Sequence, residues 1–543
     1  MIALVVLPVA VLAVNLAAGH ARFVARFVNA DALWTLAFFK DVIEQGGRVV
    51  DWNVGQHADF FPDRLFAFAA YLVTSHHEDW LLAYAAVNDL YFFAIAWYCL
   101  YLCRRRACGP ANAAIAALPP AVLASGLPLF ARSWGQFEWL LHYNEFPTQH
   151  FGSFFGGVLA AVIALDCIDR PVGRPALVRL AIAAALLLLC VLSDKLVILV
   201  VVPAFVTAAF YAAVVRRPES RMLPVATIAL PIAAGLAYAL NDWWWGLFLD
   251  QTPDEPRLHF DTLRYQGGVF LNALFRPGYR VQHVAAAILI AAMLWLSWTF
   301  AVSVVRPRLG RRVGIPAGRA APIVVYFVAT TLLNPAAVLA LGLLTGDPKC
   351  RYLFPALYCA LLALAATLAI SLPAGWRPGR FKLAAGAACL PLLIVPINLA
   401  APPFARAPTL ALARCLEAFG RNRDLALGLG NYWDTYPVNF ASGGKIQVLT
   451  MNGTVAARHW ANDLAWYAPR GDGRQFTFII MSSEWPDHEA LRAAYGPPAE
   501  VLECARLGPG YGNRVIWAYD RAGAERLTAL VSQAYLEIRA AGR

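Results

Sequence analysis

The sequence predicts a polytopic α-helical membrane protein with about eleven transmembrane helices and a C-terminal soluble α/β domain. Of its 543 residues, 60% are hydrophobic and only 15% are charged. Apolar runs of about 20 residues, long enough to cross a bilayer, recur as far as residue 402. After Pro402 the composition becomes that of a soluble domain. We therefore expect a transmembrane domain at 1–402 and an α/β domain at 403–543.

Eleven apolar segments are expected to span the membrane. They are residues 1–19, 79–103, 111–131, 151–168, 177–193, 195–215, 222–240, 283–305, 321–345, 352–372 and 383–402. The first has no basic stretch ahead of it, so a cleaved signal peptide is not expected. Two further segments, Asp31–Gln45 and Asp63–His77, are expected to form helices that lie at the membrane surface.

The short connections between the spans indicate the orientation of the chain. Five of them are basic, and all five fall on one side, which the positive-inside rule places in the cytoplasm. They contain Arg104–Arg106; Arg170, Arg174 and Arg179; Arg216, Arg217 and Arg221; Arg306, Arg308, Arg311, Arg312 and Arg319; and Arg377, Arg380 and Lys382. The protein is thus expected in the bacterial inner membrane. Its N-terminus would be cytoplasmic, and loops 20–78 and 241–283 and residues 403–543 periplasmic. The net charge of +11 then reflects topology and not nucleic-acid binding.

The C-terminal residues alternate between strand and helix patterns, which is typical of an α/β domain. Strands are expected at Asp424–Gly430, Lys445–Met451, Phe476–Ser482, Val501–Cys504 and Val515–Tyr519, and helices at Ala407–Phe419, His488–Tyr495 and Ala522–Arg539. Of ten cysteines, only Cys350, Cys415 and Cys504 are expected outside the cytoplasm and membrane. A Cys415–Cys504 disulfide is one pairing that the sequence allows.

Polar residues gather in the loops on the outer side. The first loop carries eight acidic residues: Asp31, Asp41, Glu44, Asp51, Asp59, Asp63, Glu78 and Asp79. Charge close to hydrocarbon is costly, so a cluster of this kind indicates a catalytic or ion-handling site. Further candidate site residues are His57, Glu145, His150, Asp194, Lys195, Arg276, Arg280, Lys349, Arg351 and Tyr352.

Carboxylates and basic groups at the lipid–water boundary suit the transfer of a sugar from a polyprenyl-phosphate lipid to a hydroxyl. An Asp can accept the hydroxyl proton, and Arg or Lys can bind the departing phosphate. The polyprenyl tail requires a groove between membrane spans, which explains a site at the boundary. The acceptor would be a glycan, a lipid or a protein.

The layout of residues 1–402 resembles the GT-C class of membrane glycosyltransferases, such as the protein O-mannosyltransferases and the lipid A aminoarabinose transferases. Asp31 stands early in a long first outer loop with two surface helices, and a second large loop, 241–283, follows the seventh span. Arg351-Tyr352 with Pro355 resembles the Arg-Tyr-x-x-Pro of several such enzymes. The resemblance implies that Asp31 is the base and that Arg351, helped by Lys349 or Arg276, binds the phosphate. Asp31 is followed by Ala32 and not by the Glu of the mannosyltransferases, so Asp51, Asp59 and Asp63 remain alternative bases.

Each candidate also has a structural interpretation. Asp31 and Asp63 stand at expected helix starts, where an N-cap is common. His57 and Asp59 suit a solvated loop, while His150 and Glu145 suit a structural hydrogen bond at the outer end of a span. Asp194 and Lys195 suit an ion pair within a tight turn, and Arg351 suits a side chain that extends to the headgroups.

Two other functions remain open: a secondary transporter, and a non-catalytic scaffold of an envelope-polysaccharide assembly system. A transporter predicts charges near mid-span and paired repeats; the sequence has few such charges, Asp89 being the main one, and no clear repeat. We see no P-loop, no GxGxxG after a strand and no HExxH. No cofactor is expected. Divalent-cation binding by the outer carboxylates is allowed, but no spacing requires it.

Overall fold

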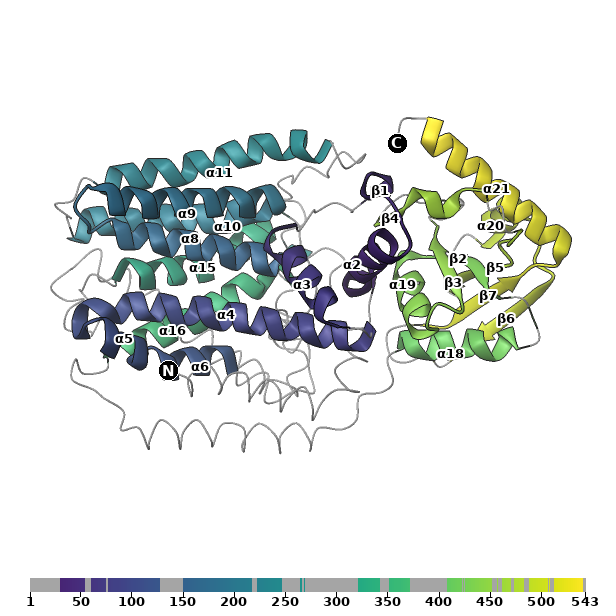
Figure 1. Cartoon of the computed structure of the whole chain (residues 1–543), viewed down its shortest axis with the longest axis horizontal. Helices are drawn as coiled ribbons and strands as arrows, with labels where there is room; N and C mark the ends of the chain where they lie inside the picture. Colours follow the sequence, from purple (N-terminus) through teal and green to yellow (C-terminus); the bar gives the residue numbers. More distant parts are fainter. Residues whose placement is uncertain are drawn as a thin grey trace.

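The structure, a computed structural model, has a helical bundle at one end and an α/β unit at the other, with helices α2 and α3 between them (Figure 1). The residues that it describes are 30–53, 60–74, 77–126, 150–216, 222–246, 264–265, 268, 321–341, 351–371, 408–421, 423, 425–451, 457, 461–469, 473–482, 488–505, 507 and 512–540. The predicted spans 1–19, 283–305 and 383–402 lie outside this set.

The bundle is built from apolar helices. They are α4 (His77–Cys108), α5 (Pro110–Ala116), α6 (Leu118–Gly126), α8 (Phe151–Cys167), α9 (Arg174–Ser193), α10 (Leu196–Tyr211), α11 (Met222–Gly246), α15 (Ala321–Ala340) and α16 (Phe354–Ser371). Among the described residues, five helices are long and apolar enough to cross a membrane, and α8 and α16 are shorter apolar helices. The protein is therefore a polytopic membrane protein.

One predicted span differs from the structure. Residues 111–131 were expected to form a single transmembrane helix, but the described part divides into α5 and α6, which meet at Ala117. Pro119 and Pro120 follow at once and have no amide hydrogen to continue the helical ladder. Both short helices pack along α4, where the indole of Trp97 donates to the carbonyl of Ala114 at 3.0 Å.

Helix α8 runs through the interior of the bundle, and nearly all of its side chains are buried. Its small residues allow neighbouring helices to approach closely. A Cβ on Gly156 would come within 2.5 Å of the sulfur of Cys190 on α9, and one on Gly157 within 2.9 Å of Val197 on α10. The packing of α8, α9 and α10 therefore depends on these two glycines.

An ion-pair cluster lies at the end of the bundle that carries two of the predicted basic connections. Asp166, at the end of α8, lies 2.5 Å from Arg105, 2.9 Å from Arg170 and 3.7 Å from Arg179. These arginines come from two of the predicted basic connections, which confirms that both connections lie at the same end of the bundle.

The first outer loop contains the two helices expected at the membrane surface. They are α2 (Ala30–Phe39), continued by a π-helical turn at Lys40–Glu44, and α3 (Leu65–Val73), preceded by a π-helical turn at Phe60–Arg64. Between them lie a 3₁₀ turn at Val49–Asp51 and the short strand β1 (Trp52–Asn53). Helix α3 exposes Leu65, Leu72 and Val73, which suits a position beside lipid headgroups.

The C-terminal α/β unit, residues 408–540, is a five-stranded mixed sheet with helices on both faces. Its elements are α18 (Pro408–Gly420), β2 (Leu427–Gly430), α19 (Tyr432–Ala441), β3 (Gln447–Thr450), β4 (Asn462–Asp463), a 3₁₀ turn (Leu464–Tyr467), β5 (Phe478–Ser482), α20 (His488–Tyr495), β6 (Glu500–Cys504), β7 (Arg514–Ala518) and α21 (Arg521–Ala540). The strand order is β3-β2-β5-β7-β6, with β2 parallel to β3 and β5, and β7 antiparallel to β5 and β6.

Alternation along the strands sends side chains into two cores. On β5, Ile479 and Met481 pack with residues of α20 and α21, whereas Phe478 and Ile480 pack with residues of α18. All five predicted strands and the three predicted helices of this region are present. Helix α19 and strand β4 were not predicted.

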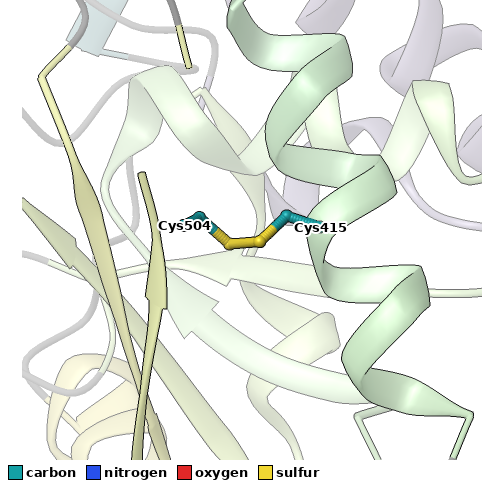
Figure 2. Close-up of a disulfide and its surroundings, with 2 residues drawn as sticks. All are labelled: Cys415 and Cys504. Carbon is teal, nitrogen blue, oxygen red and sulfur yellow. A yellow bond between two sulfur atoms is a disulfide. The ribbon is translucent and has the colours of Figure 1, made fainter. Parts of the chain in front are cut away.

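A disulfide joins the first helix of this unit to its edge strand. Cys415 on α18 is bonded to Cys504 on β6, and their Cα atoms are 6.0 Å apart (Figure 2). The pairing that the sequence allowed is thus the one formed. The bridge connects α18, the first helix of the unit, to the edge strand β6, and the two cysteines are 89 residues apart in the sequence.

We predict that Cys504→Ser lowers the thermal stability of the purified protein. The bridge closes a loop of 89 residues, for which the loop-entropy account gives roughly 4–5 kcal/mol. The transition is followed by differential scanning calorimetry, since the chain has 17 tryptophans and the fluorescence of one of them cannot be separated. Reductant should lower the wild-type transition equally and leave that of the variant unchanged. A wild-type transition insensitive to reductant would show that the bridge does not stabilise the unit.

Candidate functional site

A cavity opens at the end of the bundle opposite the Asp166 cluster. Its empty volume is about 440 Å³, part of which is open to the outside. It is lined by His150, Phe154, Asp194, Leu196, Val197, Leu199, Val200, Asn334, Ala337, Val338, Leu341, Tyr352, Phe354 and Pro355. Most of the wall is aliphatic and comes from α10 and α15. Of the polar residues, His150, Asp194 and Tyr352 lie next to helix ends, while Asn334 lies within α15. An apolar chamber with a few polar groups is typical of a ligand site.

His150 and Asp194 form a buried pair at the polar part of the cavity. Nδ1 of His150 lies 2.7 Å from Oδ2 of Asp194, and both residues are at most 4% exposed. His150 precedes α8 with φ at +90°, and its carbonyl accepts the amide of Phe154. Asp194 follows α9, and its Oδ1 accepts the amide of Leu196 at 2.9 Å at the start of α10. The pair therefore ties the start of α8 to the junction of α9 and α10.

Asn334 joins α15 to the start of α16 at the same cavity. Its side-chain amide donates to the carbonyl of Tyr352 at 3.1 Å, and its Oδ1 accepts the amide of Ala356 at 3.3 Å. The ring of Tyr352 lies 5.7 Å from the ring of His150. Arg351 begins the 3₁₀ turn Arg351–Leu353, directly before a cavity residue, but its side chain lies outside the described atoms.

Asp63 attaches the first loop to the start of α8. Its Oδ1 accepts the amide of Gly152 at 2.9 Å and its Oδ2 that of Ser153 at 3.2 Å. A carboxylate there is favoured because the first amides of a helix have no partner within it. Burial raises the pKa of Asp63 to about 6, although the two amides and His150 lower it. The capping role expected for Asp63 is present, but on α8 and not on its own helix.

Two serines complete this attachment. The hydroxyl of Ser153 donates to the carbonyl of Phe61 at 2.8 Å, and the amide of Phe61 donates to Oγ of Ser193 at 3.1 Å. Both serines are buried. The segment Phe60–Arg64 is therefore held against the ends of two bundle helices, next to the His150–Asp194 pair. The Asp63 carboxyl is close enough to both members of that pair for their charges to affect its pKa.

Asp31 lies where the first loop meets the C-terminal unit. It is in the first turn of α2, and its Oδ1 accepts a hydrogen bond from the hydroxyl of Tyr432, the first residue of α19, at 3.0 Å. Helices α2 and α19 pack against each other. Asp31 is partly exposed.

Asp41 makes a second contact between the first loop and the C-terminal unit. It is buried, and its carboxylate accepts the indole N–H of Trp52 at 2.7 Å and that of Trp466 at 2.9 Å. Strand β1 pairs antiparallel with β4, which places Trp52 opposite Asp463. Burial, together with a hydrogen bond to the Asp41 carboxyl, raises the pKa of Asp463 to about 7, although the amide of Ala465 lowers it.

The predicted site residues are therefore divided between two places. His150, Asp194 and Tyr352 line the cavity, with Asp63 nearby, while Asp31 lies at the α2–α19 contact. Lys195 stands between α9 and α10 with its ammonium 5.4 Å from the ring of Tyr238. The side chains of His57, Asp59, Glu145, Arg276, Arg280, Lys349 and Arg351 lie outside the described part.

Several residues at these places were not predicted as site residues: Ser153, Ser193, Asn334, Tyr432, Trp466 and Asp463. Asn334 had a signal, because it interrupts an apolar span, where polar residues are usually functional. Tyr432 and Trp466 had none, since ordinary aromatic residues in a soluble domain do not reveal contacts with a distant loop. Within the described ranges, no group of three or more His, Cys, Asp or Glu is placed to bind a metal ion.

The chain is similar to two solved structures. One is ArnT from Cupriavidus metallidurans bound to undecaprenyl phosphate, with 12% identity, coverage of 95% of this chain and 98% of that one, and a TM-score of 0.39. The other is the same protein in the apo state, with 14% identity, coverage of 96% and 98%, and a TM-score of 0.39. No protein-family model and no curated protein matches. The expected resemblance is confirmed as a likeness over nearly the whole chain, but at this TM-score it carries no argument about the reaction.

We predict that Asp463→Asn reduces the pH dependence of thermal stability. In the folded protein the pKa of Asp463 is about 7, against 3.8 for the free side chain. The folded state therefore binds more protons between these values, so this group lowers stability as pH rises from about 4 to about 7. Asn does not titrate, and it retains an oxygen for the amide of Ala465.

The measurement compares melting temperatures at pH 5 and pH 8. The wild type should lose stability at pH 8 relative to the variant. Asp520→Asn is a suitable control, because Asp520 also caps a helix of the same unit, through the amide of Gly523, but lies at the surface. If wild type and Asp463→Asn change equally with pH, the raised pKa is wrong.

Proposed function

We propose that this protein is a membrane glycosyltransferase of the GT-C type, which moves a sugar from a polyprenyl-phosphate donor to a hydroxyl of a glycan, lipid or protein. The observation that supports this best is the cavity. Its aliphatic wall from α10 and α15 suits a polyprenyl chain, and its polar end carries His150, Asp194, Asn334 and Tyr352. His150, Asp194 and Tyr352 lie next to helix ends, where a lipid phosphate would lie when its tail occupies the bilayer.

Cations beside the polar end would bind the phosphate. Arg351 directly precedes Tyr352, and Lys195 directly follows Asp194, so both chain positions adjoin the cavity lining. Guanidinium binds a phosphate through two parallel N–H bonds and stabilises the charge that it gains on departure. Lys349, Arg276 and Arg280 remain further candidates for this role, and Glu145, His57 and Asp59 for contact with the donor or acceptor.

Asp31 would be the general base. The acceptor oxygen forms a bond to the anomeric carbon of the sugar, the bond between that carbon and the phosphate oxygen breaks, and the acceptor proton passes to the Asp31 carboxylate. Polyprenyl phosphate leaves with the electron pair of the broken bond. The partial exposure of Asp31 supports this role. Because Asp31 lies at the α2–α19 contact and not in the cavity lining, the role requires the sugar of the bound donor to extend from the cavity to Asp31. No metal is required for these steps.

The proposed topology places the N-terminus in the cytoplasm and residues 403–543 in the periplasm. Three of the arginines from basic connections meet at Asp166, at the end of the bundle away from the cavity, which is consistent with that end being cytoplasmic. The Cys415–Cys504 disulfide supports a periplasmic C-terminal unit, because such bridges persist in oxidising compartments.

We predict that the purified protein transfers sugar from a polyprenyl-phosphate donor and that Asp31→Asn lowers the rate by roughly 10²-fold or more, the typical contribution of a general base. Asn retains the shape of Asp, the capping ability and an oxygen for the Tyr432 hydroxyl. The donor is identified by mass spectrometry of lipid-linked sugars and envelope glycans from cells with and without the gene.

Asp51→Asn is the comparison variant on the same loop. Asp51 lies 3.6 Å from Arg48 at the surface. If Asp31 is the base, the Asp51→Asn protein should transfer sugar at the wild-type rate. A normal rate for Asp31→Asn would make Asp31 a structural residue. Unchanged glycans together with no transfer from any polyprenyl-phosphate sugar would favour the transporter or the scaffold.

We predict that Arg351→Ala weakens donor binding and lowers the single-turnover rate, since one guanidinium would bind the donor phosphate and stabilise it as it leaves. Arg351→Lys should recover only part of both, because an ammonium cannot form the two parallel bonds. Donor affinity and single-turnover rate are measured for the three proteins. If both are unchanged in Arg351→Ala, the phosphate is bound elsewhere, and Lys195, Arg276 and Arg280 are tested in the same way.

A further inference from the structure

The hydroxyl of Tyr432 donates to Oδ1 of Asp31 across 401 residues of sequence. Tyr432 is the first residue of α19, and its place is defined by a cap: Asn431 accepts the amide of Asp434 at 3.1 Å. The ring of Tyr432 is 3% exposed and packs among the apolar residues of α2. The hydroxyl is therefore presented to Asp31 by a capped helix with a buried ring, and not by a mobile surface side chain.

Two other contacts fix the position of the C-terminal unit relative to α2. Strands β1 and β4 pair, with Trp52 opposite Asp463, and Asp41 accepts one indole N–H from Trp52 and one from Trp466. The two indole rings also pack edge to face, with centroids 5.1 Å apart. Asp41 lies just after α2, so it connects the helix that carries Asp31 to the unit that carries Tyr432.

We propose that Tyr432 is a positioning residue for Asp31, so that the C-terminal α/β unit completes the active site of the proposed transferase. This inference rests on the proposed function, because it assumes that Asp31 is the base.

The chemical effect of the contact follows from the donor. A hydroxyl that donates to a carboxylate stabilises the ionised form and restricts the rotation of the carboxyl group. Only the ionised form can accept the proton of the acceptor hydroxyl. Tyr432 would therefore keep Asp31 ionised toward lower pH and hold it in one orientation. Loss of the hydroxyl makes Asp31 easier to protonate, so activity should fall at a higher pH than in the wild type.

The test uses Tyr432→Phe in the full-length protein, with the polyprenyl-phosphate sugar that the mass spectrometry experiment identifies as the donor. The ring and its packing remain, and only the hydroxyl is lost. We expect a fall in kcat of roughly three- to tenfold, the equivalent of one hydrogen bond, with KM for the donor unchanged. The acid limb of the pH–rate profile should move up by roughly 0.5–1 pH unit.

Tyr436→Phe is the matched control. Tyr436 lies one turn further along α19 in the same apolar cluster, and its hydroxyl donates to the backbone carbonyl of Ala461, not to Asp31. The control loses an equally buried hydroxyl, so it should lower the melting temperature without moving the acid limb. A purely structural role for Tyr432 would give the same result in both variants.

A second variant avoids a folding problem. If Tyr432→Phe does not fold, fluorotyrosine is incorporated at position 432, which keeps the contact and makes the hydroxyl a stronger donor. The acid limb should then move to lower pH. An unchanged profile in this protein would overturn the inference.

The outcomes separate the inference from the function on which it rests. If the wild type transfers sugar, Asp31→Asn does not, and Tyr432→Phe moves the acid limb, the inference is supported. If Asp31→Asn is inactive but the acid limb of the pH–rate profile of Tyr432→Phe is unchanged, the inference is overturned, while the proposed function is not affected. A fully active Asp31→Asn removes the base and the positioning role together, and a wild type that transfers nothing overturns the proposed function itself.

Discussion

The outer end of the described bundle depends on how the first amides of α8 are satisfied. This helix start is buried, where an amide without a partner would be costly. Asp63, which arrives from the first loop, accepts the amides of Gly152 and Ser153. A Cβ on Gly152 would lie 2.8 Å from the carboxylate, so the contact requires glycine there. Together with the Ser153 and Ser193 contacts to Phe61, this carboxylate attaches the first loop to the bundle next to His150, which contacts Asp194.

The same loop is joined to the C-terminal unit by another carboxylate with neutral donors. Asp41 accepts two indole N–H groups, one from β1 and one from the 3₁₀ turn after β4. Asp63 and Asp41 thus attach opposite ends of the loop to two different folded parts. Because α2 is held on one side by these contacts and on the other by α19, the position of Asp31 depends on the bundle, the loop and the α/β unit together.

The sequence was most informative where periodicity and length decide the structure. It predicted α8 to α11, α15, α16 and the five strands of the sheet, because each is a long apolar run or a short aliphatic run between turns. It predicted a single helix at 111–131, whereas the structure divides the described part into α5 and α6, since the Pro119-Pro120 pair interrupts the helical hydrogen bonds inside an otherwise apolar run. It missed α19, whose Thr435, Pro437 and Val438 are poor helix formers, although Asn431 with Asp434 is a capping pattern. His150, Asp194 and Tyr352 could be grouped because all stand at outer ends of spans, whereas the partners of Asp31 and Asp41 depend on tertiary register and leave no local pattern.

The two ends of the bundle neutralise carboxylates in different ways, and this bears on where chemistry can occur. Asp166 is surrounded by three guanidinium groups, which balance its negative charge. At the other end, amide, indole and phenol groups donate to Asp63, Asp41 and Asp31. Neutral donors satisfy a buried carboxylate without cancelling its charge, and burial there raises the pKa of Asp63 to about 6 and that of Asp463 to about 7. The Asp63 carboxyl beside the cavity and the Asp463 carboxyl in the α/β unit thus both have a pKa near neutrality, and carboxyl groups of this kind can accept a proton near neutral pH.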